Sequence, residues 1–561
     1  MPLGEKLKSG GIRAHSKRFA DFGCGIGVAE RLECARIPPL CVDVHGPRTL
    51  QWHVARAVVH RFAPALGCAA IALLLTVSTS SAQSVPHSLA QRRWIEARTA
   101  HFHTYSCGQT QEVARLTARL EQFREAYSAL AGNESVASPP IVVMAFPDHA
   151  SMKSFVPLYQ GKPATIEAFF MRGSDENLIV LPLAGMASME VIFHEYTHLL
   201  MRHNQAFWPI WLNEGMAEIY GTFEVTGQHS ARIGLPLAHH LRLLARESLM
   251  PLKQLLEVTH ESPEYNERDR QRIFYAQSWL LTHYLMLGNN GSRRAGLGQF
   301  TALLRQGKTS EQAFTTAFHT TLTAMNNELR GYLAREKFQP LALNVNADLL
   351  APRQISTRAL PPVEVWFRLG DELMRVHRFE TAEACFLEAQ KLNPTSPLPC
   401  EGLGLLAAER DHSDEAIRWL GEALHRGSES FLAHYEYAHE KFEASATQPG
   451  WHARLPADKG ADIRAELHKA LELMPDFGPA HHLLGLFEFI QHDDLAGAVQ
   501  HLQRAIQLEP ENQGYLISLA QAQFEKDGAE AARRTLEPLR LPYVEPEIRA
   551  RAQELLKEMG K

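Results

Sequence analysis

The chain has 561 residues, and 57 Lys and Arg against 63 Asp and Glu give a formal net charge of −6. With 45% hydrophobic and 21% charged residues it has an ordinary globular composition, which excludes a largely disordered chain, and its length predicts two or three domains. The mild acidity argues against a nucleic-acid partner, and no apolar run reaches the ~20 residues of a membrane span.

An export signal is predicted near the amino end. Residues 65–77 form an apolar run that follows basic residues and precedes Ser80-Ser81-Ala82. Charged, apolar and small-residue segments in this order are typical of a secretory signal. We therefore predict a signal peptide at 54–82, cut near Ala82, and a periplasmic or secreted protein without a stable membrane span in the mature chain. A buried core helix and a lipid-modified Cys68 are the alternatives.

Residues 1–53 do not fit this signal, because a signal peptide is only about 15–30 residues long. The segment has no clear apolar period. We expect it to be an untranslated or disordered extension, with the true start near Val54 or Val58.

The next region alternates between strand and helix patterns. Strands are predicted at 93–107, 141–146 and 177–182, and helices at 109–131 and from about 187 to 202. This order predicts an α+β unit. From 236 to about 336 the pattern is mostly helical.

A metal-binding motif lies on the second of these helices. His194-Glu195-Tyr196-Thr197-His198 reads HExxH, and residues at i and i+4 project from one face of a helix. Two imidazoles placed in this way can bind one Zn²⁺, with Glu195 near the metal-bound water.

The downstream segment 211–218, WLNEGMAE, offers further acidic residues. A catalytic zinc needs a third protein ligand, which Glu214 can supply from a second helix. Glu218 lies one turn later and can fix a ligand imidazole by a hydrogen bond. Glu218 in place of Glu214, and His203 in the manner of metzincins, are the alternative third ligands.

These residues resemble the gluzincin metallopeptidases. The likeness is closest to peptidase-MA-like bacterial proteins, which join HExTH to a WLxEGxAE segment and a Tyr-x-x-Ser-Trp helix, here 275–279. It covers roughly residues 95–340. The spacing to Glu214 is shorter than in thermolysin-like enzymes, and a GxMEN-type exopeptidase motif is missing.

The resemblance implies a zincin-like peptidase domain. His194, His198 and Glu214 would bind zinc, and Glu195 would be the general base that takes a proton from zinc-bound water. Glu218 would support a ligand histidine. The strand at 177–181 would be the edge strand along which an extended peptide docks.

A tyrosine is expected to assist catalysis. Tyr275 is the candidate donor to an oxyanion, and Tyr220 competes for this role. A core position with a satisfied hydroxyl is the alternative for either residue.

From residue 363 a pattern of large and small apolar residues recurs every 34 residues. In the first unit, positions 4, 7, 8, 20, 24, 27 and 32 are Trp366, Leu369, Gly370, Ala382, Phe386, Ala389 and Pro394. The pattern closely resembles the tetratricopeptide repeat. Four more units follow, the third interrupted around 444–462 and the fifth degenerate. We predict an all-α repeat solenoid over 363–555 with a groove for a protein partner.

The patterns, together with the resemblance, predict an α+β zincin-like catalytic domain at 91–345, a proline-rich linker at 346–362 and the all-α tetratricopeptide-repeat solenoid. Because of the linker, we expect the domains to fold independently. Cys385 and Cys400 could form a disulfide.

The leading hypothesis is an exported zinc metallopeptidase that acts on a peptide or protein substrate and recruits a protein through its repeats. The alternative is a non-catalytic protein-binding scaffold in which the zincin-like domain is structural. The presence of Glu195 favours the enzyme.

Overall fold

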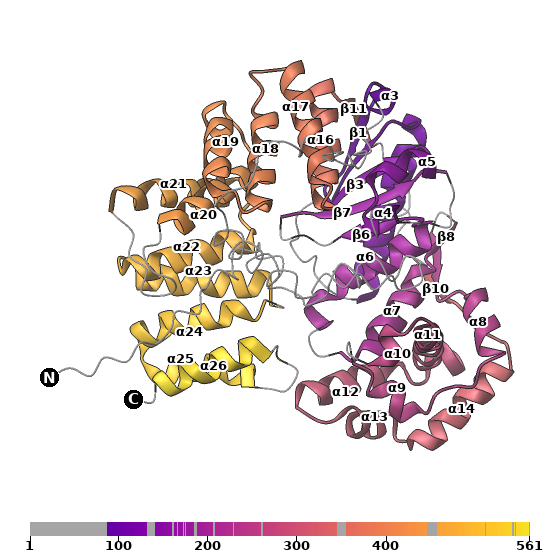
Figure 1. The fold of residues 1–561 in the computed structure, drawn as a ribbon. Helices are drawn as coiled ribbons and strands as arrows, with labels where there is room; N and C mark the ends of the chain where they lie inside the picture. The colour runs from indigo at the N-terminus through magenta and orange to yellow at the C-terminus, as the bar shows by residue number, and fades with distance from the viewer. Residues whose placement is uncertain are drawn as a thin grey trace, which may run out of the picture.

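The computed structural model describes most of the chain after residue 86. Described are residues 87–559, apart from 132–140, 160–161, 165, 172, 174, 185–187, 206–207, 228, 260–261, 345–354, 446–456, 511, 541–543 and 545. The expected extension 1–53 and signal peptide 54–82 lie outside them. No helix in the described part is long and apolar enough to cross a membrane. A mixed α/β part is followed by an arc of paired helices (Figure 1).

A six-stranded sheet forms the centre of the α/β part. Its strands are β1 Ile95–Arg98, β2 Phe102–Ser106, β3 Ile141–Phe146, β6 Phe169–Met171, β7 Asn177–Pro182 and β11 Ser356–Ala359. They lie in the order β11-β1-β2-β3-β7-β6. The pairs β2–β3 and β3–β7 are parallel, with Val142 opposite Leu178, and the other pairs are antiparallel.

Alternate residues of this sheet enter two different cores. Val143 and Ile179 pack on one face, whereas Met144 and Val180 pack on the other. Because both faces are covered, β3 is a continuous apolar run, IVVMAF, in which all six residues are buried.

Helices α4 (Thr110–Ala131), α6 (Ser188–Gln205), α7 (Ile210–Gly221) and α11 (Arg268–Gly291) contribute to the core on the first face. The other helices of this part are α3 His87–Ala90, α5 His149–Met152, α8 Ala238–Leu244, α9 Leu252–Leu256, α10 Pro263–Asn266, α12 Arg294–Arg305, α13 Ser310–Phe318 and α14 Leu322–Ala334. Two smaller sheets are formed by β4 Leu158–Tyr159 with β5 Lys162–Pro163, and by β8 Glu224–Gly227, β9 Ser230–Ile233 and β10 Leu341–Asn344.

The structure corrects three sequence-based predictions about the strands. The strand expected at 93–107 is two antiparallel strands, β1 and β2. The segment at 177–181 is not the edge strand, because β6 pairs with β7 and takes the outer position. The predicted linker 346–362 contains β11, which pairs with β1 and is the opposite edge strand.

Paired helices make up the rest of the described chain. They are α16 Pro362–Arg375, α17 Phe379–Leu392, α18 Pro397–Glu409, α19 Ser413–His425, α20 Phe431–Ser445, α21 Ala457–Leu473, α22 Gly478–Gln491, α23 Leu495–Leu508, α24 Gly514–Asp527, α25 Ala529–Leu536 and a last helix, α26 Pro546–Glu558.

Glycine at the eighth position of a repeat allows close helix packing. A Cβ on Gly370 would lie 2.6 Å from the Phe386 ring, and a Cβ on Gly404 would lie 2.6 Å from Leu420. Gly485 stands in the same relation to Leu502. The predicted solenoid and its register therefore agree with the observed helix pairs.

The first repeat and the sheet share one hydrophobic core. Trp366 and Leu369 of α16 belong to the same buried cluster as Phe146 and Val180. This core argues against the expectation that the two parts fold independently. Cys385 and Cys400 are free thiols, so the suggested disulfide is wrong.

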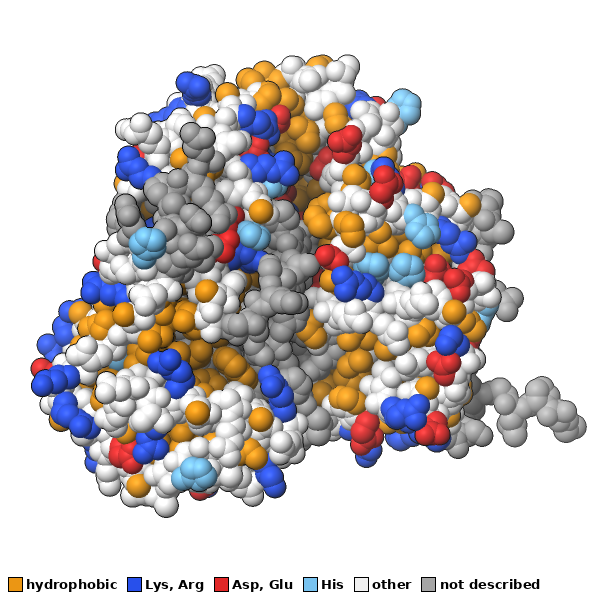
Figure 2. All heavy atoms as spheres, turned by 180° about the vertical axis from the view of Figure 1, so that it is seen from behind, with side chains coloured by type: hydrophobic (Ala, Val, Ile, Leu, Met, Phe, Trp, Pro, Cys, Tyr) orange, Lys and Arg blue, Asp and Glu red, His pale blue; other side chains and the backbone are white. Residues whose placement is uncertain are grey.

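Positive and negative side chains are interspersed on the face shown in Figure 2.

Candidate metal centre

Helix α6 presents its two histidines beside its buried side. Met189, Ile192, Phe193 and Tyr196 follow the helical period and are buried in the core below the sheet. His194 and His198 share the neighbouring stripe, and both are buried, at 6% and 9% exposure. Their Nε2 atoms are 3.2 Å apart. The i, i+4 spacing therefore brings the two imidazoles together as predicted.

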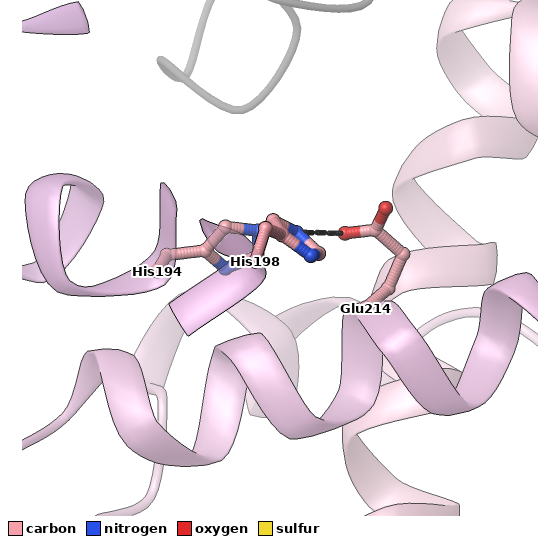
Figure 3. Close-up of side chains that lie close together, drawn as sticks. All are labelled: His194, His198 and Glu214. Carbon is pink, nitrogen blue, oxygen red and sulfur yellow. Dashed lines mark hydrogen bonds and ion pairs between the residues drawn. The ribbon is translucent and has the colours of Figure 1, made fainter. Parts of the chain in front are cut away.

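Helix α7 brings Glu214 to this pair. Close packing is possible at Gly221, where a Cβ would lie 3.4 Å from the Cβ of His194. Glu214 Oε2 lies 3.4 Å from Nε2 of His194 and 3.4 Å from Nε2 of His198. Figure 3 shows the carboxylate pointing at the two rings.

The three atoms fit the ligand triangle of a zinc ion. Bonds of about 2.0–2.1 Å in a tetrahedral site separate neighbouring ligand atoms by about 3.3–3.4 Å. The observed separations are 3.2, 3.4 and 3.4 Å. Glu214 Oε2 is buried, and its 3.4 Å contacts with the two nitrogens are longer than ordinary hydrogen bonds. Such an arrangement suits a shared cation better than a hydrogen-bond network.

Three carboxylates, those of Glu195, Glu214 and Glu218, act on the charge of His194. Burial opposes ionisation of His194, but the neighbouring carboxylates, Glu214 first, raise its pKa to about 9. Burial would raise the pKa of Glu214, but the charges of His198 and His194 hold it well below its usual range. A divalent cation bound here would replace the protons on the imidazoles as the positive charge that faces these carboxylates.

Glu218 lies near His194, but too far from it for the hydrogen bond that the sequence analysis predicted, so its supporting role stays a prediction. Its Oε1 is 4.0 Å from Nδ1 of His194 and 3.3 Å from Nε2 of His240. Despite burial, the charge of His240 lowers the pKa of Glu218 to about 2. Glu218 therefore connects His194 to a second histidine rather than to the metal position.

His240 is a site residue that the sequence analysis missed. It lies on α8, is 5% exposed, and its ring is 5.9 Å from that of Trp279 on α11. The His239-His240 pair in an otherwise apolar segment was the available signal.

Glu195 follows His194 on α6 and has a buried Oε1 without a hydrogen-bond partner among the described residues. Tyr275 lies on α11, where it stacks on Tyr265 with 6.3 Å between the ring centroids. Tyr220 lies on α7, with its ring 5.0 Å from that of Tyr127, and burial raises its pKa to about 12. The catalytic roles of Glu195 and of either tyrosine stay predictions. The side chain of His203 lies outside the described atoms.

A second histidine–carboxylate group lies in the repeats. Glu436, His439 and Glu440 of α20 also have candidate ligand atoms within 4.8 Å of one another. Nδ1 of His439 is 3.9 Å from Oε2 of Glu436, a wider separation than in the first group. We therefore place the candidate metal centre at His194, His198 and Glu214.

Comparison with known proteins identifies the repeats. Residues 363–396 and 489–557 match models of the tetratricopeptide repeat, which confirms this part of the sequence analysis and indicates a protein-interaction role. No curated protein matches the chain significantly.

Three solved repeat structures align with about a third of the chain. YrrB, a TPR protein described as having an unusual peptide-binding site, is 16% identical over 34% of this chain and 91% of its own, with a TM-score of 0.28. MamA from Desulfovibrio magneticus RS-1 is 16% identical over 36% and 97%, with a TM-score of 0.26. A thermophilic TPR protein from Thermus thermophilus is 18% identical over 35% and 99%, with a TM-score of 0.27.

Proposed function

We propose that this chain is an exported, zinc-dependent peptidase whose repeats bind protein. The observation that carries the proposal is the triangle of His194, His198 and Glu214, whose separations match a zinc site with an open fourth position. Export rests on the segment around 65–77 and stays a prediction.

The places of the residues support the role that we propose for each of them. A zinc ion at this position would supply the Lewis acidity that peptide hydrolysis needs. Glu195 would accept a proton from the attacking water and donate it to the leaving amine. Oε1 of Glu195 is buried and has no hydrogen-bond partner among the described residues. This atom is suited to accept a proton and to donate it again, because no such hydrogen bond competes for it.

Glu218 has a supporting role. A carboxylate behind a ligand histidine orients the ring and increases its basicity. Through its 3.3 Å contact with His240, Glu218 is itself held in place by α8.

The test compares metal content with turnover in the full chain. We expect about one zinc per wild-type chain by elemental mass spectrometry. Glu214→Ala should lower zinc occupancy, because it removes the third ligand. Glu195→Gln should keep zinc and should hydrolyse β-casein about 10²–10⁴-fold more slowly than the wild type.

Glu247→Ala is the matched control, because Glu247 is exposed, whereas the three ligands are buried. This variant should change neither the zinc content nor the β-casein turnover. Full activity of zinc-loaded Glu195→Gln would refute the general-base role.

A protein-binding scaffold is the second candidate, favoured by the repeat matches. It would give a folded chain, with or without zinc, and no turnover dependent on Glu195. Peptides that accumulate with the wild type and not with Glu195→Gln, identified by mass spectrometry in the native host, would favour the peptidase.

A further inference from the structure

Buried charges join the central sheet to the first repeat. Asp175 and Glu176 come directly before β7, and Arg375 is the last residue of α16. Arg375 binds Asp175 with Nη2–Oδ2 at 2.7 Å and Nη1–Oδ1 at 3.3 Å, and its Nη2 lies 3.0 Å from Oε1 of Glu176. The side chains of Arg375, Asp175 and Glu176 are 13%, 10% and 19% exposed. One mostly buried guanidinium therefore faces two carboxyl groups.

Helix α16 adds a second arginine and a third carboxyl group. Oδ2 of Asp371 lies 3.5 Å from Nε of Arg375 and 3.9 Å from Nη1 of Arg368. Arg368 in turn lies over the ring of Tyr105 on β2, with 4.8 Å between its Cζ and the ring centroid. Two arginines can balance only two carboxylates. Asp175 and Asp371 take this role, because each contacts a guanidinium and aspartate is a stronger acid than glutamate.

Glu372 and Glu176 are left without a positive charge of their own. Glu372 is 2% exposed, and neither of its carboxylate oxygens has a hydrogen-bond partner among the described residues. A buried carboxylate without hydrogen bonds costs far more than the neutral acid. Burial, followed by the charge of Asp371, raises the pKa of Glu372 well above its usual range. Burial also raises the pKa of Glu176 to about 7, although Arg375 opposes this shift.

Helix α18 brings a further acid rather than a positive charge. Glu401 is 7% exposed and accepts a 2.9 Å hydrogen bond from the Ser428 hydroxyl. Burial raises the pKa of Glu401, against the hydrogen bonds of Ser430 and Ser428 and the charge of Arg368. The carboxyl groups of this junction cluster are thus those of Asp175, Glu176, Asp371, Glu372 and Glu401. Among the described residues, no three of them bring ligand atoms within 4.8 Å of one another, so protons suit the balance better than a shared metal ion.

We propose that the junction between the central sheet and the first repeat is a pH-sensitive device: protons on Glu372 and Glu176 hold it together, and their release as the pH rises loosens α16 from the sheet. Loss of the protons would leave two buried carboxylates uncompensated beside Asp371, and like charges at this distance repel. The proposal rests on the geometry of the junction cluster and does not depend on the proposed peptidase function.

The direction of the effect follows from the protons bound in each state. The ordinary pKa of a glutamate is about 4.5, and that of Glu176 in the folded chain is about 7. Between these values the folded state holds more protons than the unfolded state, so stability falls as the pH rises. The contribution of the junction is complete below pH 4.5 and is lost as the pH rises through 7. The junction should therefore be tighter at pH 5 than at pH 8.

The experiment uses the full chain with Glu372→Gln and Glu176→Gln. Glutamine has nearly the size of the protonated acid and cannot lose its charge balance. The control is Glu380→Gln on α17, whose side chain is 79% exposed. Hydrogen exchange of α16 and β7 is measured at pH 5 and pH 8, corrected for the intrinsic exchange rate at each pH. Helix α13, in the α/β part, serves as the internal reference.

In the wild type, protection of α16 and β7 should fall at least about tenfold between pH 5 and pH 8, with little change in α13. Each glutamine variant should lose much of this pH dependence, and Glu380→Gln should keep it. An unpaired amide in Glu372→Gln would weaken the junction equally at both pH values, so the pH dependence remains the deciding quantity. The infrared band of protonated carboxyl groups at pH 6 should also weaken in Glu372→Gln.

The same pH dependence of α16 and β7 in the wild type and in both glutamine variants would overturn the proposal. An equal pH dependence in α13 would also contradict it, because the effect would then not belong to the junction. If Glu372→Gln fails to fold, Glu176→Gln, which alters a less buried side chain, decides the question by the same comparison.

Discussion

The buried histidines of this chain differ in charge because different groups face them. Carboxylates raise the pKa of His194 to about 9, whereas burial lowers the pKa of His283 to about 4 and that of His482 to about 3. Both nitrogens of His283 have neutral partners: Nε2 lies 3.0 Å from the Gly234 carbonyl and Nδ1 lies 2.8 Å from the Tyr332 hydroxyl. A neutral ring that donates from Nε2 and accepts at Nδ1 satisfies both contacts, so His283 is structural.

The first prediction at the residue scale concerns the pH dependence that His283 causes. Its pKa is about 4 in the folded chain and near 6.5 in the unfolded chain, so between these values the unfolded state binds more protons. The stability it contributes is present above pH 6.5 and is lost as the pH falls toward 4. Between pH 7 and pH 5 the wild type should therefore lose about 2 kcal/mol more unfolding free energy than His283→Gln.

Urea unfolding of both chains at the two pH values measures this difference. His229→Gln, at an exposed position, is the control and should follow the wild type. Equal losses in the wild type and His283→Gln would show that His283 does not have the expected effect.

At the element scale, the position of Glu214 depends on how closely α7 packs on α11. A Cβ on Gly215 would lie 2.5 Å from the Ser278 carbonyl oxygen and 2.0 Å from Oγ1 of Thr282. Both obstacles are on α11, and one of them is backbone, so a side chain at 215 must push the helices apart. Because Glu214 is the adjacent residue, such a shift would move it away from His194 and His198.

Gly215→Ala should therefore destabilise the fold by about 1–3 kcal/mol and weaken zinc binding. Gly331→Ala on α14 is the control, because nothing lies within 4 Å of its added Cβ. In an exposed helix this change should raise stability by up to about 1 kcal/mol. Thermal unfolding with zinc titration measures both effects. Wild-type stability and zinc affinity in Gly215→Ala would show that α7 can be displaced without consequence.

The parts of the site that the sequence predicted are those set by local geometry. His194 and His198 share a face by helical period, and Glu214 and Glu218 are one turn apart on the next helix. His240 comes from a third helix, and no local period connects it to Glu218. The same limit applies to the sheet: β6 has only three residues, and the pairing of β11 with β1 joins segments more than 250 residues apart. The prolines around 352–362 therefore resembled a linker.

At the scale of the whole molecule, the central sheet lies between two hydrophobic cores, one beside the candidate metal centre and one shared with the repeats. Ile141, Val143 and Ile179 face the side of α6 and α7. Met144 and Val180 face the side that α16 completes with Trp366. Since a change on one face of a packed sheet reaches the other, the repeats are structurally linked to the candidate site.

The last prediction follows from the core that the sheet shares with the first repeat. A fragment 87–345 lacks β11 and α16, so the core on this face of the sheet, which includes Tyr105, Met144 and Val180, all at most 2% exposed in the whole chain, would lose the side chains that α16 contributes to it. Burial of each large apolar side chain contributes about 1.5–3 kcal/mol. Even partial exposure of several such side chains removes a large share of the ~5–15 kcal/mol that holds a domain folded. We expect the fragment 87–345 to aggregate or to unfold without cooperativity. The longer fragment 87–427 ends at Gly427 after α19 and keeps β11 and the first two repeats. It should unfold cooperatively and bind zinc. Calorimetry and zinc content of the two fragments measure this. A soluble, cooperative, zinc-binding 87–345 fragment would instead show that the α/β part is an independent domain, as the proline-rich segment alone suggested.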